Sequence, residues 1–272
     1  MPELPEVETI VRELNAQVPG RAIEEVRVFR ADALGGVPPA AFRAALLGRT
    51  LGRVRRRGKF LVFPLAPAGF LIGHLRMTGK FVLAPRSAPP APHHRVWFDL
   101  SGARRLIFQD MRCFGTLALV GRLAESPALA ALGLEPLSRR FTAAWLAVAL
   151  ARSRMPLKHW LMHQGHVAGL GNIYAAEILF RARLSPLARA DGLSAAEVGR
   201  LHRATRQVLR QAIASNGTTI SDYRRVDEKS GEFQNFLRVY GKGGQPCPVC
   251  RTPVQRIRQQ QRSTFFCPTC QP

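Results

Sequence analysis

Four of the five cysteines form two closely spaced pairs near the end of the chain. Two residues separate Cys247 from Cys250, sixteen residues follow, and Cys267 and Cys270 then repeat the spacing. This pattern predicts a tetrahedral site in which four thiolates hold one Zn²⁺. Two disulfides are the alternative, but they need an oxidising compartment that the sequence does not indicate. Because thiolates fill all four positions, we expect the zinc to be structural and not to activate water.

The residues between the two cysteine pairs are predicted to form a short β-hairpin. A hairpin of this length has no hydrophobic core of its own, so the zinc would supply its stability. Three arginines, Arg256, Arg258 and Arg262, lie in this segment and suit phosphate groups. The fifth cysteine, Cys113, is interpreted as a plain small residue in a strand or loop.

The balance of charge indicates a polyanionic partner. The chain of 272 residues has 40 Lys and Arg against 18 Asp and Glu, a net charge of +22. Nucleic acid is the usual partner of such a protein. A hydrophobic content of 46% excludes a disordered basic tail. No run of 18 apolar residues occurs and the first residues are acidic, so we expect neither a membrane span nor secretion, and a cytoplasmic location.

The first half of the chain reads as β-structure after one helix. Apolar spacing from Pro5 predicts an amphipathic helix that ends near Pro19. Short apolar runs separated by Gly and Pro clusters then predict a β-sandwich or barrel, interrupted by a short helix at 39–48. The predicted strands are 26–29, 60–65, 70–75, 80–84, 95–100, 104–108 and 115–120.

The texture changes to helical after about residue 121. Helices are predicted at 141–150, 157–162 and 173–180, and Ser194 with Glu197 forms a capping box that opens a longer one. The fold class is therefore α+β and multidomain: a β-sandwich with flanking helices, a helical part and a zinc-finger hairpin. The predicted division is 2–121, a connection at 122–140, 141–240 and 241–272.

The acidic start of the chain is unusual for a protein that binds phosphates. Glu3, Glu6, Glu8 and Glu13 lie within the first 13 residues. Acidic residues favour the first turn of a helix because they complement its dipole, and this accounts for Glu8 and Glu13. It accounts less well for Glu3 and Glu6, which lie next to the chain start and are candidates for chemistry.

Three segments together resemble one family. The opening PELPEVET at 2–9, the segment 163–177 and the cysteine motif are similar to those of formamidopyrimidine-DNA glycosylases, bacterial enzymes that excise oxidised purines. The resemblance covers essentially the whole chain. It implies a β-sandwich, a helix–two-turn–helix module and a zinc finger. It also implies a monomer that acts on duplex DNA carrying 8-oxoguanine, formamidopyrimidines or abasic sites, and a bacterial location at the nucleoid.

The resemblance assigns the chemistry to the amino terminus. Removal of Met1 leaves Pro2 with a secondary amine whose pKa is about 8. This amine would attack the sugar C1′, displace the base and form a Schiff base that allows β,δ-elimination. Glu3 is implied to be the catalytic carboxylate and Glu6 a supporting one. The resemblance also implies that Lys59 reaches the phosphate beside the lesion and that Arg262 is the zinc-finger counterpart of the phosphate ligand Asn172. We count both Lys59 and Arg262 among the catalytic residues.

A flipped nucleotide leaves a gap that side chains must fill. Met77, Arg112 and Phe114 match the family's wedge, in which apolar side chains stack and a guanidinium contacts the orphaned base. Asn172, at the start of a helix, matches the family's phosphate ligand. The remaining predicted DNA contacts are His93, Lys158 and Tyr240. Residues 218–232 resemble the loop that folds over the extruded base.

Three other interpretations remain. The sister enzyme for oxidised pyrimidines, endonuclease VIII, shares Pro2, Glu3 and the zinc finger, but it typically has glycine where this chain has Leu4. A DNA-binding protein without catalysis would keep the wedge and lack a free Pro2 nitrogen. A zinc-ribbon RNA or ribosomal protein explains the charge but not the acidic amino terminus.

Overall fold

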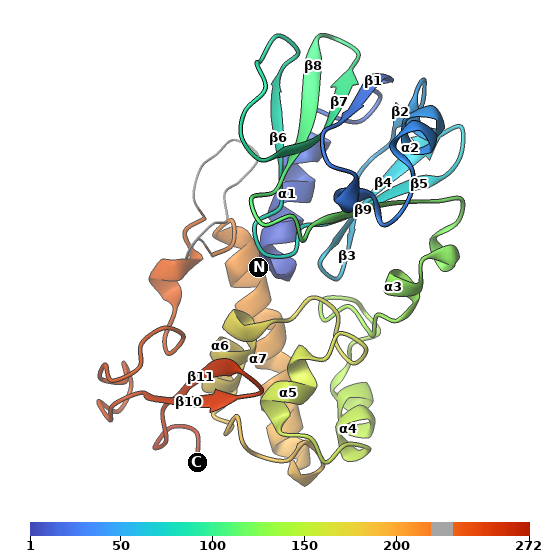
Figure 1. Cartoon of the computed structure of the whole chain (residues 1–272). Coiled ribbons are helices and arrows are strands. Elements are labelled where there is room, and N and C mark those ends of the chain that lie inside the picture. The colour runs from blue at the N-terminus through green and yellow to red at the C-terminus, as the bar shows by residue number, and fades with distance from the viewer. Residues whose placement is uncertain (219–230) are drawn as a thin grey trace. The chain divides into compact units, whose positions relative to one another are not determined.

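The computed structural model describes residues 1–218 and 231–272 (Figure 1). The chain divides into two compact units. The amino-terminal unit comprises Met1–Ala130 and Asn216–Glu232, and the carboxy-terminal unit comprises Ala131–Ser215 and Phe233–Pro272. The first unit is rich in strands and the second in helices, so the predicted mixed class is confirmed.

The amino-terminal unit begins with helix α1, Leu4–Asn15. Glu3 caps the helix, and the next residues bury one apolar stripe, as the sequence predicted. The helix ends at Asn15, four residues before Pro19, and the Asn15 side chain bonds to the main chain of Val54. It donates a hydrogen bond to the Val54 carbonyl at 2.9 Å and accepts one from the Val54 nitrogen at 2.8 Å. This pair joins the end of α1 to the five-stranded sheet described next.

Two antiparallel sheets follow α1. One has the order β1-β7-β8-β6, and the other has the order β2-β4-β5-β9 with β3 paired to β4. All seven predicted strands are present. The strands of the first sheet are β1 Ile23–Val28, β6 Lys80–Pro85, β7 His94–Leu100 and β8 Arg104–Gln109. Those of the second are β2 Thr50–Leu51, β3 Arg55–Arg57, β4 Phe60–Ala66, β5 Phe70–His74 and β9 Thr116–Val120.

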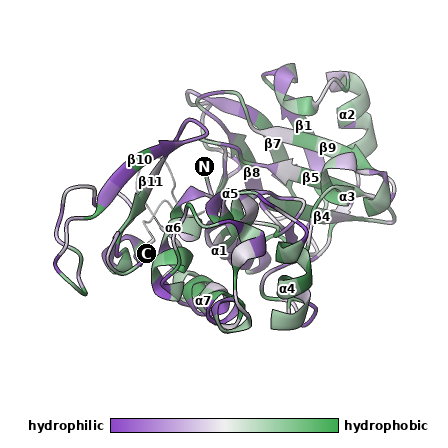
Figure 2. Cartoon of the chain, turned by 90° about the horizontal axis from the view of Figure 1, so that it is seen from below, coloured by the Kyte–Doolittle hydropathy of each residue, from purple (hydrophilic) through white to green (hydrophobic). Residues whose placement is uncertain are grey.

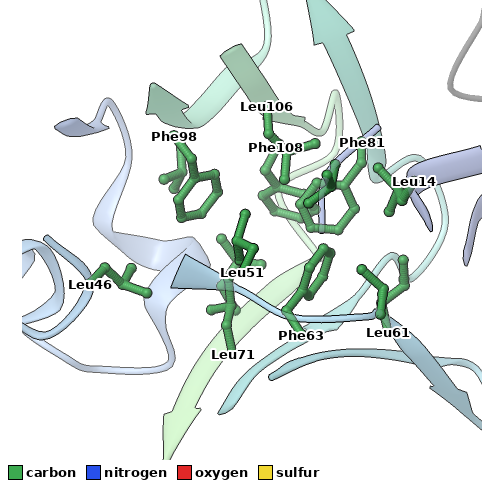
Figure 3. Packing of buried hydrophobic residues seen from close by; sticks show 14 of the residues in the cluster. Leu14, Leu46, Leu51, Leu61, Phe63, Leu71, Phe81, Phe98, Leu106 and Phe108 are labelled. Atoms are coloured by element: carbon green, nitrogen blue, oxygen red, sulfur yellow. The ribbon is translucent and has the colours of Figure 1, made fainter. Parts of the chain in front are cut away.

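The two sheets face each other across an aromatic core (Figure 3). Phe63 of β4 packs against Phe81 of β6, with ring centroids 5.2 Å apart, and Phe81 packs against Phe108 of β8 at the same distance. These rings are fully buried, and Leu14 of α1 belongs to the same cluster. Apolar burial of this kind is the main stabilising contribution to such a domain. The predicted β-sandwich is thus confirmed.

The shorter helices of the amino-terminal unit lie at its connections. Helix α2, Pro39–Leu46, buries Phe42 against Phe98 of β7. The remaining helices of this unit are η1 Ala31–Leu34, η2 Leu123–Glu125 and α3 Pro127–Ala130.

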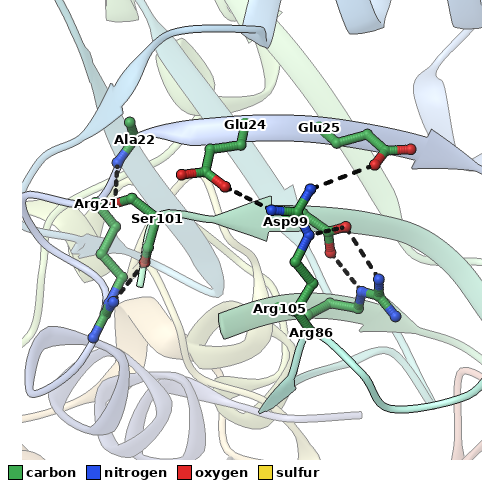
Figure 4. Close-up of polar contacts among 8 residues, drawn as sticks. All are labelled: Arg21, Ala22, Glu24, Glu25, Arg86, Asp99, Ser101 and Arg105. Carbon is green, nitrogen blue, oxygen red and sulfur yellow. Dashed lines mark hydrogen bonds and ion pairs between the residues drawn. The ribbon is translucent and has the colours of Figure 1, made fainter. Parts of the chain in front are cut away.

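A charged network covers the outer face of the four-stranded sheet (Figure 4). Asp99 of β7 is buried and accepts hydrogen bonds from the guanidinium of Arg105 on β8, one of them at 3.0 Å. Arg86 lies 3.2 Å from Asp99 and 2.7 Å from Glu24 of β1. The Arg105 guanidinium also stacks over the Trp97 ring at 3.7 Å. These contacts join three strands and the segment after β6.

The carboxy-terminal unit is built on helix α7, Ala195–Ala214. The predicted capping box is present: Ser194 Oγ accepts from the Glu197 nitrogen, and the Glu197 carboxylate accepts from the Ser194 nitrogen at 2.8 Å. The other helices are α4 Ala143–Ala151, α5 Leu157–Met162, α6 Asn172–Ala182, η3 Ala190–Gly192 and η4 Phe233–Phe236. None of the helices in the described ranges is long and apolar enough to cross a membrane.

The chain ends in the predicted hairpin. Strands β10, Gln255–Gln259, and β11, Arg262–Phe266, pair in antiparallel register. Figure 2 shows β10 as hydrophilic over most of its length, whereas Phe265 of β11 packs against a cluster that includes Ala176 and Phe180. Gln271 anchors the tail by donating a hydrogen bond to the Leu184 carbonyl at 2.9 Å.

Candidate active site and metal centre

The amino terminus of the chain is a buried acidic site. Pro2 is buried, and Glu3 and Glu6 are only 3% and 2% exposed. The Glu6 carboxylate accepts a hydrogen bond from the Glu3 nitrogen and another from the Thr218 nitrogen, both at 2.8 Å. Gly217 permits this approach, because a Cβ at that position would lie 2.8 Å from a Glu6 oxygen. The first turn of α1 therefore holds two carboxylates beside the chain start.

Charges of both signs surround the terminal amine. Burial lowers the pKa of the Met1 amine from its usual value, and the nearby cations lower it further, while the two carboxylates oppose the shift. Met1 is attached in this chain, so the Pro2 nitrogen is an amide here. The groups that act on the amine are Glu3, Glu6, Lys59 and Arg112. The fold thus brings four of the predicted site residues into one electrostatic environment.

Lys59 lies in the tight turn between β3 and β4. Gly58 before it has φ +56°, a conformation that glycine adopts without strain, and Lys59 itself is buried. The neighbouring Arg56 forms an ion pair with Glu8 of α1 at 3.0 Å. Glu8 therefore joins α1 to this turn, which gives it a structural role.

The three predicted wedge residues lie on two loops of the amino-terminal unit. Met77 lies in the turn between β5 and β6, and Arg112 and Phe114 lie between β8 and β9. Met77 and Phe114 are large apolar side chains that are 39% and 58% exposed. Met111, which was not among the predicted residues, is also exposed and adjoins Arg112. Apolar side chains held in water at loop tips are typical of a binding surface.

Two further residues have left-handed backbones, one in the loop between β8 and β9 and one directly before β7. Cys113 has φ +58° and His93 has φ +69°. Cys113 lies in the loop, as expected for a small residue without a further role. His93 is exposed, and its carbonyl accepts a hydrogen bond from the Asp110 nitrogen at 3.0 Å. The His93 backbone, directly before β7, is thus bonded to the residue that opens the loop of Arg112.

In the carboxy-terminal unit the zinc-finger hairpin is fastened to the helices at Ser263. The Ser263 carbonyl accepts hydrogen bonds from the amide nitrogen of Asn172 at 3.0 Å and from Nζ of Lys158 at 3.1 Å. Lys158 also donates to the Thr264 hydroxyl at 2.6 Å and is 1% exposed. These contacts fix the strand whose first residue is the exposed Arg262. The predicted contact of Lys158 with DNA stays a prediction.

Asn172 is the first residue of α6, and Gly171 caps that helix. The Asn172 side-chain oxygen is buried and has no hydrogen-bond partner. Since the amide nitrogen is bonded to Ser263, the side chain is fixed beside the positive end of the α6 dipole. Asn172 is thus bonded to Ser263, the residue that follows Arg262 on β11.

Glu177 is a buried carboxylate beside the candidate site and was not among the predicted residues. It is buried in α6 and accepts hydrogen bonds from three consecutive main-chain nitrogens, those of Arg238, Val239 and Tyr240, at 2.9, 3.0 and 2.9 Å. Burial raises the pKa of Glu177, and the three N–H groups oppose this shift. The bonds hold Tyr240 in place, where its ring packs on Phe265 at 5.3 Å. The sequence signal that could have indicated Glu177 is a single carboxylate among the apolar residues of a predicted helix.

The four cysteines form a site that fits zinc. Their sulfur atoms all lie within 4.8 Å of one another, with pairs 3.3 and 4.0 Å apart. A tetrahedral Zn²⁺ with zinc–sulfur bonds of about 2.3 Å needs sulfur–sulfur distances of about 3.8 Å. Burial and then the neighbouring thiols raise the pKa of Cys270 to about 12. A cation is therefore needed to keep all four sulfurs deprotonated, and one structural Zn²⁺ meets that need.

The loop predicted to fold over the extruded base spans 218–232, and residues 219–230 of it lie outside the described residues. At its start, the Thr218 nitrogen is bonded to Glu6.

Family models match three successive parts of the chain. The Formamidopyrimidine-DNA glycosylase N-terminal domain matches residues 1–117, and the Formamidopyrimidine-DNA glycosylase H2TH domain matches residues 132–224. The zinc finger found in FPG and IleRS matches residues 244–272.

Curated relatives match over the full length. The formamidopyrimidine-DNA glycosylase of Symbiobacterium thermophilum is 44% identical, covering 100% of this chain and 90% of the relative. That of Desulfitobacterium hafniense is 43% identical, with 100% of both chains covered.

Solved structures agree. The MutM (Fpg) protein of Thermus thermophilus has a TM-score of 0.90 and 44% identity, with 99% of this chain and 98% of that chain covered. A complex between Lactococcus lactis Fpg and DNA containing an abasic site has a TM-score of 0.92 and 34% identity, with 99% of each chain covered.

The fold and the matches define a zinc-finger DNA-repair glycosylase. The chain belongs to the formamidopyrimidine-DNA glycosylase family. It is accordingly a base-excision-repair enzyme for oxidised purines, with glycosylase and AP lyase activity.

Proposed function

We propose that this chain removes 8-oxoguanine and formamidopyrimidines from duplex DNA through the amine of Pro2, and then cuts the strand at the abasic site. The observation that carries the proposal is the buried amino terminus, where two carboxylates and a lysine act on the first amine of the chain. This arrangement suits covalent catalysis by an amine, since burial increases the neutral, nucleophilic fraction.

The first step is attack of the Pro2 nitrogen on the sugar C1′. The bond from C1′ to the damaged base breaks, the base takes the electron pair and a proton, and the amine nitrogen loses its proton. The C1′–O4′ bond then breaks, O4′ takes a proton as the sugar ring opens, and the nitrogen lone pair forms the iminium cation with C1′. That cation acidifies the neighbouring C2′ position. Loss of a proton there breaks the C3′–O bond, and a second elimination breaks the C5′–O bond. Hydrolysis of the iminium then frees the enzyme.

Glu3 and Glu6 have different roles, one in proton transfer and one in positioning. Glu3 adjoins the amine and is the residue that moves protons during attack and elimination. Glu6 has both of its oxygens bonded to main-chain nitrogens, so its role is to hold the terminus and Thr218 in place. Lys59, held in its turn, binds the phosphate beside the lesion.

DNA binding uses both units. We assign Met77, Arg112 and Phe114 to the gap left by the flipped nucleotide, because their loops expose apolar side chains around a guanidinium. Phosphate contacts are assigned to Asn172 and Arg262, and the further contacts to His93, Lys158 and Tyr240. The enzyme would act as a monomer in the bacterial cytoplasm, on the nucleoid. Its four parts are 2–121, 122–140, 141–240 and 241–272.

Strand cleavage of defined duplexes tests the proposal. Protein from which Met1 has been removed is incubated with duplexes that carry either 8-oxoguanine opposite cytosine or thymine glycol opposite adenine. We expect cleavage of the purine duplex, with phosphates left on both flanking ends. Glu3→Gln should abolish base release, whereas Glu24→Gln, a substitution on the outer face of β1, should not change it.

Two results would contradict the proposal. Cleavage of the thymine glycol duplex alone would move the chain to the specificity of the sister enzyme. Salt-sensitive binding of the purine duplex without any cleavage would show a DNA-binding protein that lacks the chemistry.

A further inference from the structure

Asp110 is a fully buried carboxylate outside the proposed catalytic groups. It follows the last residue of β8 and is 0% exposed. Its two oxygens accept from three donors: the Thr78 hydroxyl and the Arg112 nitrogen on one oxygen, and the Gly115 nitrogen on the other. The distances from the two nitrogens are 3.2 and 2.7 Å. A buried carboxylate that is this fully bonded fixes the groups around it.

The bond to Thr78 connects two loops that are distant in sequence. Thr78 follows Met77 in the turn between β5 and β6, and Asp110 opens the loop between β8 and β9. The Arg112 nitrogen is shared, because it also lies 3.1 Å from the Thr78 hydroxyl oxygen. One small polar cluster therefore sets the distance between the loop of Met77 and the loop of Arg112 and Phe114.

The surroundings leave these loops little freedom. A Cβ at Gly115 would lie 2.6 Å from the Phe108 ring and 3.1 Å from an Asp110 oxygen. A Cβ at Gly79 would lie 2.5 Å from the Leu75 carbonyl. Arg95 also donates a hydrogen bond to the Asp110 carbonyl at 2.6 Å. The bases of both loops are thus packed against backbone and rings, while their tips are exposed.

We propose that Asp110 is a positioning residue: with Thr78 it locks the two loops into one rigid wedge, so that Met77, Arg112 and Phe114 enter the duplex together. The proposal rests on the wedge assignment made under the proposed function. Side chains that replace an extruded nucleotide must resist the restacking of the bases around them. Loops that could separate would yield to that restacking, whereas loops joined through a buried carboxylate do not.

The substitution Asp110→Asn removes the lock with little change of volume. An asparagine has one oxygen and one NH₂ group in place of two oxygens. With its nitrogen towards Gly115, that NH₂ meets an N–H group. With its nitrogen towards Thr78, the hydroxyl can turn to accept, but the NH₂ then meets the Arg112 N–H. Either orientation sets donor against donor in a buried site.

The test separates wedge insertion from chemistry. Single-turnover base release is measured on a duplex with 8-oxoguanine opposite cytosine. Borohydride trapping is measured on a single-stranded abasic DNA, which needs no extrusion. The fluorescence of 2-aminopurine placed next to the lesion reports unstacking as the wedge enters. Thermal unfolding shows that each variant is folded.

We expect Asp110→Asn to slow base release about a hundredfold, because small displacements of inserted groups are costly, and to suppress the fluorescence rise. Trapping on single-stranded DNA should stay within about twofold of the parent. Thr78→Val should slow base release about tenfold, and Thr78→Ser, which keeps the hydroxyl, should restore it. The variant with both substitutions should release base no more slowly than Asp110→Asn alone. The reason is that each substitution disrupts the same hydrogen bond, between Thr78 and Asp110.

The matched control is Asp99→Asn. Asp99 is also a buried carboxylate of this unit, but it lies in the ionic network on the outer face of the sheet (Figure 4). This variant should lose thermal stability and keep the fluorescence rise. The proposal is overturned if Asp110→Asn and Asp99→Asn lose activity in proportion to their stability, or if trapping and base release fall together. Failure of the parent protein to release base would instead contradict the proposed function.

Discussion

The Glu6 carboxylate bonds to the main chain of Thr218, 212 residues further along the sequence, at 2.8 Å. Its other oxygen holds the Glu3 nitrogen beside the chain start. One side chain therefore links the terminus to the first residue of the segment predicted to fold over the extruded base.

Replacing Glu6 with glutamine should break one of the two hydrogen bonds of this link. The NH₂ group of the glutamine would face one of the two main-chain N–H groups in a buried site. We expect a loss of about 1–3 kcal/mol in the free energy of unfolding, the usual cost of an unsatisfied buried group. Urea unfolding measures it, and base release should fall with it. An unchanged midpoint would show that the contact with Thr218 contributes little.

Stability should depend on pH through His74. Burial, and then the charges of Arg76 and Lys59, lower the pKa of His74 to about 3. Between its usual pKa of about 6.5 and this lowered value, the unfolded chain binds a proton that the folded chain refuses. His74 therefore does not lower the free energy of unfolding above about pH 6.5. As the pH falls below that value the free energy of unfolding decreases, and at about pH 4 the contribution of this residue is a loss of about 3 kcal/mol.

Urea unfolding at about pH 7 and about pH 4 checks this, with His74→Gln as the comparison. The glutamine oxygen can still accept from the Arg76 nitrogen, which bonds the His74 ring at 3.0 Å. The variant should lose less stability than the parent between the two pH values. Equal losses would assign the pH dependence to other groups.

Zinc removal should affect the hairpin and spare the sandwich. We expect one Zn²⁺ per chain by elemental analysis. Cys267→Ser should abolish zinc binding and weaken duplex binding strongly, because the hairpin lacks a core without the metal. Cys113→Ser is the matched control and should change neither. A zinc-free protein that still bound DNA at full affinity would contradict a structural role for the metal.

DNA binding should weaken steeply with salt. Each phosphate contact releases counterions, so the logarithm of the affinity falls linearly with the logarithm of the salt concentration. Arg262→Ala should reduce that slope by about 1, whereas Arg43→Ala on helix α2 should leave it unchanged. Fluorescence anisotropy with an undamaged duplex at several salt concentrations measures both. A parent slope near zero would contradict phosphate binding.

Most of the sandwich could be predicted because each strand is an apolar run between breakers. The exceptions show which elements a local sequence pattern cannot predict. Strand β3 consists of Arg55, Arg56 and Arg57, and only its pairing with β4 makes it a strand. The end of α1 is held by hydrogen bonds between the Asn15 side chain and the main chain of Val54, residues 39 positions apart, which no local pattern contains.

Some residues of the candidate site could likewise be predicted from the sequence, and others could not. Spacing alone predicted the four cysteines, because zinc geometry imposes a spacing on the sequence. The family resemblance supplied Pro2 and the wedge. Neither spacing nor the family resemblance predicted Glu177 and Asp110, because their roles depend on the main-chain nitrogens from which they accept hydrogen bonds. Residues that act by holding other residues can be found only in three dimensions.

The central claim is that the amine of Pro2 becomes bonded to the sugar. Met1-free protein is incubated with an 8-oxoguanine duplex and borohydride, and the adduct is digested and mapped by mass spectrometry. We predict one DNA adduct, on Pro2, and none from protein that retains Met1. An adduct on a lysine, or an equal yield with Met1 retained, would contradict it.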